Sequence, residues 1–164
     1  MTVTNYFARK EDLVFDRADL LVGELARTVA ERPAGQTPVD AARAGFLAAV
    51  RARSPLVGFA RASFARMVDG SAVLTARYRE MLDLRDRRLA DRLRDEFGLS
   101  DPIAQFHAAQ LGSVVRILTG EARRRLIEGL SPGDLQVFLE IAGGQMFDLL
   151  DGAPGDLRPP PVSS

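Results

Sequence analysis

The sequence contains no cysteine and no tryptophan, and His107 is its only histidine. The absence of cysteine excludes disulfides, thiolate metal ligands and a thiol nucleophile. A single histidine without carboxylates at metal-ligand spacing, and no glycine-rich phosphate loop, leave zinc, nucleophilic and nucleotide chemistry without their usual residues. Asp91 and Asp95 are spaced as a carboxylate pair on a helix, but their arginine-rich surroundings favour salt bridges. We therefore expect neither an enzyme nor a bound metal or cofactor.

The sequence also lacks an excess of charge of either sign and any long apolar run. It has 22 basic and 22 acidic residues, so no overall field attracts nucleic acid or an anionic membrane. No segment is apolar for long enough to span a bilayer, and the first residues lack the pattern of a signal peptide. With 164 residues, of which 46% are hydrophobic, the chain can bury one sizeable core. We expect a single soluble domain in the cytoplasm, with no membrane partner.

Proline residues mark four places where helices should begin. Each of these prolines follows a side chain that can accept a hydrogen bond from the first turn of a helix, and proline itself suits that turn. The four pairs are Thr37-Pro38, Ser54-Pro55, Asp101-Pro102 and Ser131-Pro132.

Apolar residues recur with helical spacing between these starts, which predicts an all-α fold of about six helices. The last two helices are apolar on more than one side, so each should have two contacts. The segment 152–164 is rich in glycine and proline, and we expect a disordered tail there. The expected helices span about residues 10–31, 38–53, 55–68, 72–97, 102 onward and 132–150, with a turn at residues 69–71.

The run Asn5-Tyr6-Phe7-Ala8-Arg9-Lys10-Glu11-Asp12-Leu13 resembles the junction between the recognition helix and the fourth helix of TetR-type transcriptional regulators. In that family an aromatic pair is followed by two variable positions and then by Lys-Glu-x-Leu. The rest of the chain resembles the family only in the number, lengths and ends of its helices. The resemblance implies a TetR-type C-terminal ligand-binding and dimerisation domain over residues 10–151, preceded by a remnant of the DNA-binding domain over residues 1–9.

The resemblance also implies that most of a helix-turn-helix module is missing from this sequence. Its first two helices and nearly all of its recognition helix have no counterpart before Tyr6, so this chain alone should not recognise operator DNA. We expect that the natural product starts further upstream; a natural protein without the module is the alternative. By resemblance, Tyr6 and Lys10 contact DNA phosphates. Alternatively, Tyr6 packs on the missing helices and Lys10 is solvated.

In TetR-type regulators the central helices enclose a cavity for a small molecule. Such a cavity needs adaptable aromatic and thioether walls with a few polar groups, and the central helices here carry residues of that kind. The implied effector is small and largely apolar, and its charge stays open. The same side chains can equally be ordinary core. The candidate ligand-binding residues are Phe46, Phe59, Ser63, Met67, Tyr78, Met81, Phe106, His107 and Gln110.

Three polar residues lie on otherwise apolar helix faces. His107 and Gln110 share such a face, and a polar group there needs a hydrogen-bonding partner. That partner can be a ligand, a backbone carbonyl or a tyrosine hydroxyl. Arg85 interrupts the apolar stripe of the long helix over residues 72–97. It could bind an acidic effector, although pairing with Asp86 or Glu80 on a solvated edge is the favoured alternative.

In the same family the last two helices pair with those of a second subunit, which implies a homodimer. The last helix here is apolar on two sides, and a terminal helix is seldom central, so its second side is expected to meet another subunit. Gly143 and Gly144 allow a neighbouring helix to approach closely, unless they merely kink their own helix. The candidate interface residues are Leu118, Leu126, Val137, Ile141, Gly144 and Gln145.

These patterns favour a TetR-like transcriptional regulator of the repressor type, whose helical body binds an effector and dimerises. Effector binding would favour a conformation in which the helix beginning near Lys10 swings and changes the separation of the two DNA-binding modules. The alternative is a stand-alone dimeric helical module that binds a ligand or a partner and no DNA. The genomic sequence upstream of Met1 discriminates between them, because an in-frame helix-turn-helix there supports the regulator.

Overall fold

The computed structural model describes residues 18–151, and every regular element in that range is a helix. The all-α prediction is therefore confirmed for the described residues. Tyr6, Lys10, the beginning of the predicted helix over residues 10–31 and the predicted tail lie outside them. The elements are α2 (Ala18–Ala30), α3 (Pro38–Arg51), the 3-10 helix η1 (Pro55–Val57), α4 (Ala62–Asp69), α5 (Ala72–Phe97), α6 (Asp101–Ile127) and α7 (Pro132–Asp151).

Capping side chains mark where the helices begin. At α3, the Asp40 N–H donates to Thr37 Oγ1 at 3.1 Å and the Thr37 N–H donates to Asp40 Oδ2 at 3.0 Å, which is a capping box. At α7, the Asp134 N–H donates to Ser131 Oγ at 3.1 Å. The predicted starts of both helices are thus confirmed. The α6 helix begins at Asp101 itself, one residue earlier than expected, because the preceding residue takes the extended N-cap conformation.

The single helix predicted over residues 55–68 is wrong, because the structure divides this segment into η1 and α4. Gly58 ends η1 with a φ of 108°, in the left-handed region that glycine adopts without strain. A Cβ at this position would lie 2.3 Å from the Cβ of Ala122 on α6, so the backbone here runs directly against that helix. The chain therefore changes direction at Gly58, and α4 begins anew at Ala62.

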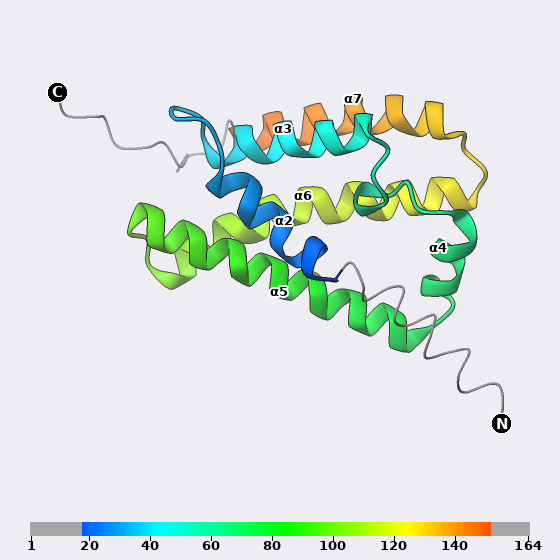
Figure 1. Cartoon of the computed structure of the whole chain (residues 1–164), viewed down its shortest axis with the longest axis horizontal. Helices are drawn as coiled ribbons and strands as arrows, with labels where there is room; N and C mark the ends of the chain where they lie inside the picture. The colour runs from blue at the N-terminus through cyan, green and yellow to red at the C-terminus, as the bar shows by residue number, and fades with distance from the viewer. Residues whose placement is uncertain (1–17, 152–164) are drawn as a thin grey trace.

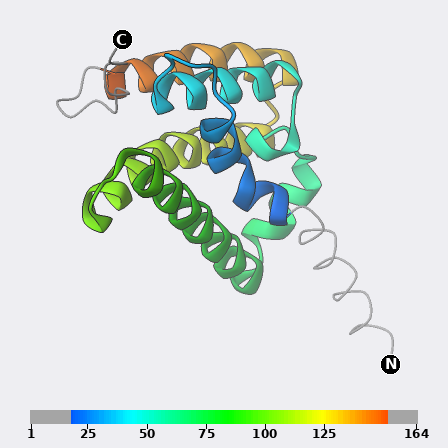
Figure 2. The same cartoon turned by 60° about the vertical axis from the view of Figure 1, so that its left-hand side comes forward.

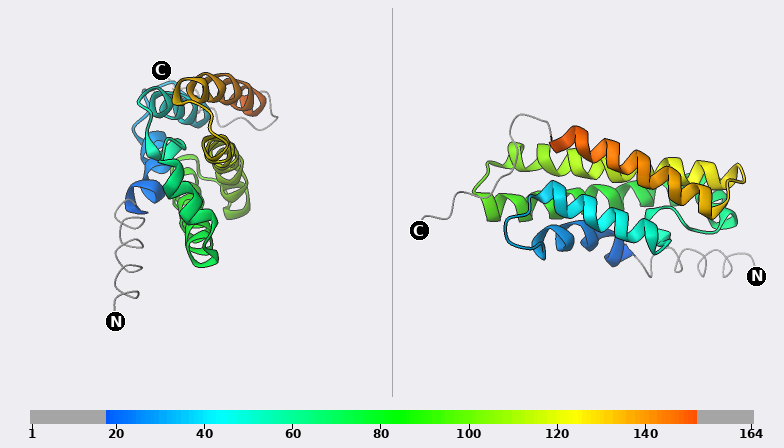
Figure 3. Two further views of the ribbon diagram at one scale, coloured as in Figure 1. Left: turned by 90° about the vertical axis from the view of Figure 1, so that its right-hand side faces the viewer. Right: turned by 90° about the horizontal axis from the view of Figure 1, so that it is seen from above.

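The helices form an elongated arrangement with α3 and α7 side by side along one edge and α5 along the other (Figure 1). The α6 helix lies between these edges and contacts both α5 and α7. The α2 helix crosses α5 and reaches α3 (Figure 2). Seen from above, the long helices follow the long axis of the molecule, while α4 lies near one end (Figure 3). Short connections make α5, α6 and α7 antiparallel neighbours.

One hydrophobic core extends through these helices. Leu89 and Leu93 of α5 and Leu139 and Phe147 of α7 are completely buried. Phe46 of α3 packs on Phe147 with the ring centroids 6.0 Å apart, which joins α3 to α7. Within residues 18–151, no helix combines the length and the hydropathy needed to cross a bilayer.

Candidate ligand cavity and exposed helix face

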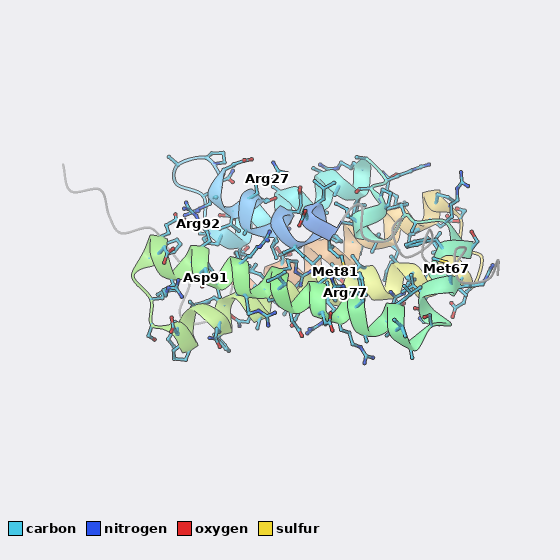
Figure 4. All side chains as sticks on the ribbon, turned by 60° about the horizontal axis from the view of Figure 1, so that its bottom comes forward. Arg27, Met67, Arg77, Met81, Asp91 and Arg92 are labelled. Carbon is cyan, nitrogen blue, oxygen red and sulfur yellow. The ribbon has the colours of Figure 1, made fainter. Side chains whose placement is uncertain are left out.

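A cavity of about 150 Å³ lies between α2, η1, α4, α5 and α6. Tyr78 and Met81, both predicted from the sequence, line it. Met81 is buried midway along α5, on the side of that helix that faces α2 (Figure 4). A dry cavity of about this size accepts a ligand such as benzene. The apolar part of its wall consists mainly of Leu21, Leu56, Phe64, Ala65, Val68 and Met81.

Tyr78, Thr119 and Arg123 supply the polar groups of this first cavity. The guanidinium carbon of Arg123 lies 5.6 Å from the centroid of the Tyr78 ring, and Arg123 Nε is 3.1 Å from Asp69 Oδ1 at the end of α4. Thr119 is one turn before Arg123 on α6, and its hydroxyl donates to the Val115 carbonyl at 2.8 Å. An apolar wall with a few hydrogen-bonding groups is the usual composition of a small-molecule site.

A second cavity of about 100 Å³ lies between α2, α3, η1, α5 and α6. Leu21 and Leu56 line both cavities and therefore form a common wall between them. Phe46, another of the predicted residues, lines the second cavity. The polar residues of this second cavity are Glu24, Thr28, Ser54 and Arg85.

Arg85 is the one charged side chain among the described residues that is buried, with 2% of its surface exposed. Its Nε and Nη2 donate to Asp86 Oδ1 at 2.9 and 2.7 Å, and Nη2 also donates to the Gly112 carbonyl at 2.9 Å. The predicted pairing with Asp86 is confirmed, but the predicted solvated edge is wrong because α6 covers the guanidinium. Gly112 leaves room for the Asp86 carboxylate beside α6, since a Cβ at position 112 would lie 2.2 Å from Asp86 Oδ1.

The structure places six of the predicted ligand-binding residues away from both cavities. Phe106 is 57% exposed on α6, and its ring contacts that of His107 with the centroids 5.6 Å apart. This side of α6 points away from the core because Ala104 and Ala108 form its inner side. The other four are Phe59, Met67 and Gln110, which are half-buried, and Ser63, which is exposed.

Sequence reasoning missed several residues that line the first cavity. Leu21 and Leu56 have the spacing of ordinary core residues, and nothing in the sequence distinguishes a cavity wall from packed core. Arg123 begins the run Arg123-Arg124-Arg125, which by itself indicates a solvated helix surface. Asp69, two residues after the predicted Met67, was the available signal that Arg123 has a partner on α4.

An exposed apolar stripe runs along α6. Ile103, Phe106 and Ile117 recur at helical spacing, and Phe106 and Ile117 each expose more than half of their surface. On the neighbouring helix α7, Val137 and Ile141 are 57% and 58% exposed and lie one turn apart. Both of these α7 residues belong to the predicted interface. Two adjacent helices thus carry large apolar side chains that the part of the chain described by the structure leaves exposed.

No family model, curated protein or solved structure matches this chain. Its function is therefore inferred from the two cavities and the exposed stripes, together with the resemblance at residues 5–13.

The other four predicted interface residues differ from Val137 and Ile141 in how far they are buried. Leu118 is 2% exposed and Leu126 is half-buried against the core, so neither forms an exposed surface for a second copy. Gln145 is exposed and Gly144 is half-buried. The expected close approach at Gly143 occurs within this chain, because a Cβ there would lie 2.9 Å from Phe46 Cε1 on α3. The α7 helix continues unbroken through both glycines.

Charged residues follow the exposed stripe of α6 toward its C-terminal end. Arg124 Nη2 and Arg125 Nε donate to Glu121 at 2.6 and 2.7 Å. These two hydrogen bonds lower the pKa of the Glu121 carboxyl to about 2, so it stays ionised at neutral pH.

On α5, the salt bridge predicted for Asp91 is present: Arg94 Nη1 lies 2.9 Å from Asp91 Oδ1.

Proposed function

We propose that this chain is the effector-binding and dimerising body of a TetR-like transcriptional regulator of the repressor type. The observation that carries the proposal is the pair of adjoining cavities among the central helices. Their walls are mainly apolar, and Tyr78, Thr119 and Arg123 add a few polar groups to the first of them. This composition suits a small, largely apolar effector.

The position of α2 supports a route from effector to DNA. Leu21 of α2 lines both cavities, so a ligand in either one contacts this helix. By the resemblance, the helix that contains α2 follows directly after the DNA-binding module. An effector that fits one orientation of α2 better than another shifts the population toward that orientation. In a dimer this would change the separation of the two modules.

Homodimerisation is supported by the exposed stripes of α6 and α7. Monomeric proteins seldom expose neighbouring large apolar side chains on adjacent helices, and a two-fold axis would bury the same stripes of both copies. We propose an interface that includes Val137, Ile141 and Gln145 of the predicted set, together with Phe106 and Ile117. Operator DNA is a proposed partner only for a chain that also carries a complete helix-turn-helix module.

The second candidate function is a stand-alone dimeric module that binds a ligand or a partner without DNA. The balance of 22 basic and 22 acidic residues favours it over DNA binding by this chain alone. Electrophoretic mobility shifts separate the two candidates when the native product is compared with this 164-residue chain on upstream DNA from its own locus. Binding by a longer native product supports the regulator, whereas a native product of this length without binding supports the stand-alone module.

Filling the first cavity tests its role in ligand binding. Ala65 of α4 is buried in the cavity wall, whereas Ala76 of α5 is exposed. We expect the chain to bind benzene or toluene in ligand-detected NMR, and Ala65→Leu to weaken binding at least about tenfold by occupying the space. The matched variant Ala76→Leu should leave binding unchanged. An unmodified chain that binds no small apolar probe would contradict the proposal.

A further inference from the structure

The second cavity contains a buried group with unused hydrogen-bonding capacity. Arg85 lines this cavity, and its Nε and Nη2 use their hydrogens on Asp86 and on the Gly112 carbonyl. Its Nη1 makes no hydrogen bond to any residue that the structure describes. A guanidinium has five N–H donors, and donors that are buried without an acceptor destabilise the protein. The two N–H groups of Nη1 therefore have no acceptor among residues 18–151, and a ligand in the cavity that Arg85 lines can supply one.

The charges around the cavity limit what that acceptor can be. Arg85 is already paired with Asp86, and Glu24, the other charged residue of the lining, is 2.8 Å from Arg27. A ligand carboxylate would lie close to Glu24 without meeting an unpaired cation, and a ligand ammonium would meet the donors of Arg85. Each would also lose its hydration in a largely apolar cavity. An uncharged acceptor oxygen avoids all of these costs.

The rest of the lining defines the body of the ligand. Phe46, Leu25, Val57 and Val115 form apolar walls, and Thr28 and Ser54 add two neutral hydroxyls. The volume of about 100 Å³ limits the part held here to a small ring or a short branched chain. The volume of the second cavity and the polarity of its lining therefore match a compact molecule with a single polar end.

We infer that the second cavity binds the carbonyl end of a compact, uncharged and otherwise apolar molecule, such as a ketone, lactone or ester, with Arg85 Nη1 as the hydrogen-bond donor. This inference rests on the proposed ligand-binding function and specifies its ligand class. The apolar remainder of a longer ligand extends past Leu21 and Leu56 into the first cavity.

Four six-membered-ring probes test the inference on the full chain. Cyclohexanone and methylenecyclohexane have the same shape but differ in the acceptor oxygen, while cyclohexanecarboxylate and cyclohexylammonium carry the two charges. Dissociation constants come from two-dimensional NMR titrations in which the backbone amide resonances of Thr28, Gly45 and Val115, which line the second cavity, are followed in the unmodified chain and in each variant. We expect cyclohexanone to bind about tenfold more tightly than methylenecyclohexane, which is the effect of one hydrogen bond to a charged donor, and the charged probes to bind more weakly.

Variants connect this preference to Arg85. Arg85→Lys keeps a positive charge beside Asp86 but removes Nη1, and it should abolish the preference for cyclohexanone while methylenecyclohexane still binds. Arg88→Lys, on the exposed side of the same helix, should retain the preference. If Arg85→Lys fails to fold, Ala49→Leu serves instead, because it fills the cavity from α3 and should weaken cyclohexanone binding at least tenfold.

The possible results separate the two proposals. Equal binding of cyclohexanone and methylenecyclohexane would mean that water occupies the Nη1 donors, which overturns the ligand class and leaves the proposed cavity function intact. Tighter binding of cyclohexanecarboxylate than of cyclohexanone would also overturn the ligand class. So would a preference for cyclohexanone that persists in Arg85→Lys, or cyclohexanone binding that is unaffected by Ala49→Leu. If no probe binds in either cavity, the proposed function itself is contradicted.

Discussion

Arg85, Asp86 and Gly112 form a group in which each residue depends on the other two. The Arg85 guanidinium is buried because Asp86 neutralises it and the Gly112 carbonyl accepts a further hydrogen bond. The Asp86 carboxylate in turn occupies the space that a side chain at position 112 would need. A buried ion pair adds little net stability over apolar packing, but breaking it is costly.

Gly112→Ala tests this dependence. The new Cβ would overlap Asp86 Oδ1, and the carboxylate can move only by leaving Arg85, so the free energy of unfolding should fall by about 2–3 kcal/mol. Gly120→Ala, in the same helix with nothing within 4 Å of its new Cβ, should instead raise stability by about 0.5–1 kcal/mol. Urea denaturation measures both. Equal effects of the two substitutions would show that Gly112 is merely a poor helix former.

The pair of Arg32 and Glu96 joins the end of α2 to the end of α5. Arg32 Nη1 donates to Glu96 Oε2 at 3.2 Å and to the Val29 carbonyl at 2.7 Å. The hydrogen bond from Arg32, with a further contribution from Arg92, holds the pKa of Glu96 below its ordinary value of 4.5. Because the pKa is lower in the folded state, the stabilisation is complete above pH 4.5 and is lost as the pH falls through the folded pKa.

Glu96→Gln should therefore have a pH-dependent effect. At pH 7 the variant should lose about 1–2 kcal/mol of unfolding free energy, and the difference from the unmodified chain should shrink progressively as the pH falls below about 4.5. Urea unfolding at a series of pH values between 7 and 3 measures this difference. A constant difference over that range would show that the charge of Glu96 contributes nothing.

At the scale of the elements, helix ends were more predictable than helix continuity. The prediction from Ser and Thr before proline succeeded because the cap and the first turn are local. The division of residues 55–68 was missed because an isolated glycine is tolerated in a helix, and the sequence does not show that Gly58 adopts the left-handed conformation close to Ala122 on α6. Ala122 is 64 residues after Gly58 in the sequence, so no local pattern can reveal that the two residues lie close together.

Gly58→Ala should disrupt the connection between η1 and α4. The substitution combines a left-handed backbone with a Cβ 2.3 Å from that of Ala122, so we expect a loss of about 3 kcal/mol of unfolding free energy. Gly98→Ala provides the matched control, since Gly98 is also left-handed but has open space around it, and it should cost about 1 kcal/mol. Thermal and urea unfolding followed by circular dichroism measure both variants. Losses of equal size would indicate that the contact with α6 is unimportant.

At the scale of the whole molecule, the candidate site was only partly predictable from the sequence. Phe46, Tyr78 and Met81 line cavities as expected, since aromatic and thioether side chains on central helices are apt to do so. The outward position of Phe106 could not be predicted, because α6 is apolar around much of its circumference and periodicity does not say which side faces the core.

The proposed homodimer interface on α6 and α7 can be tested by a substitution at its centre. Ile141→Glu places a charge on the exposed stripe of α7 and should raise the dimer dissociation constant about a hundredfold or more, since the charge would be buried at the interface. Val73→Glu, on an even more exposed apolar residue of α5, should leave the oligomeric state unchanged. Sedimentation velocity over a range of concentrations measures both. Identical behaviour of the two variants would place the interface elsewhere.

Leu21 and Leu56 belong to both cavities, and this shared wall has a thermodynamic consequence. A ligand that pushes either side chain aside enlarges its own cavity at the expense of the other. Occupancy of the two cavities by separate molecules is therefore antagonistic, and the antagonism must be the same whichever molecule binds first. A single molecule that spans the wall would avoid this antagonism, so under the proposed function the chain would select ligands by length as well as by polarity.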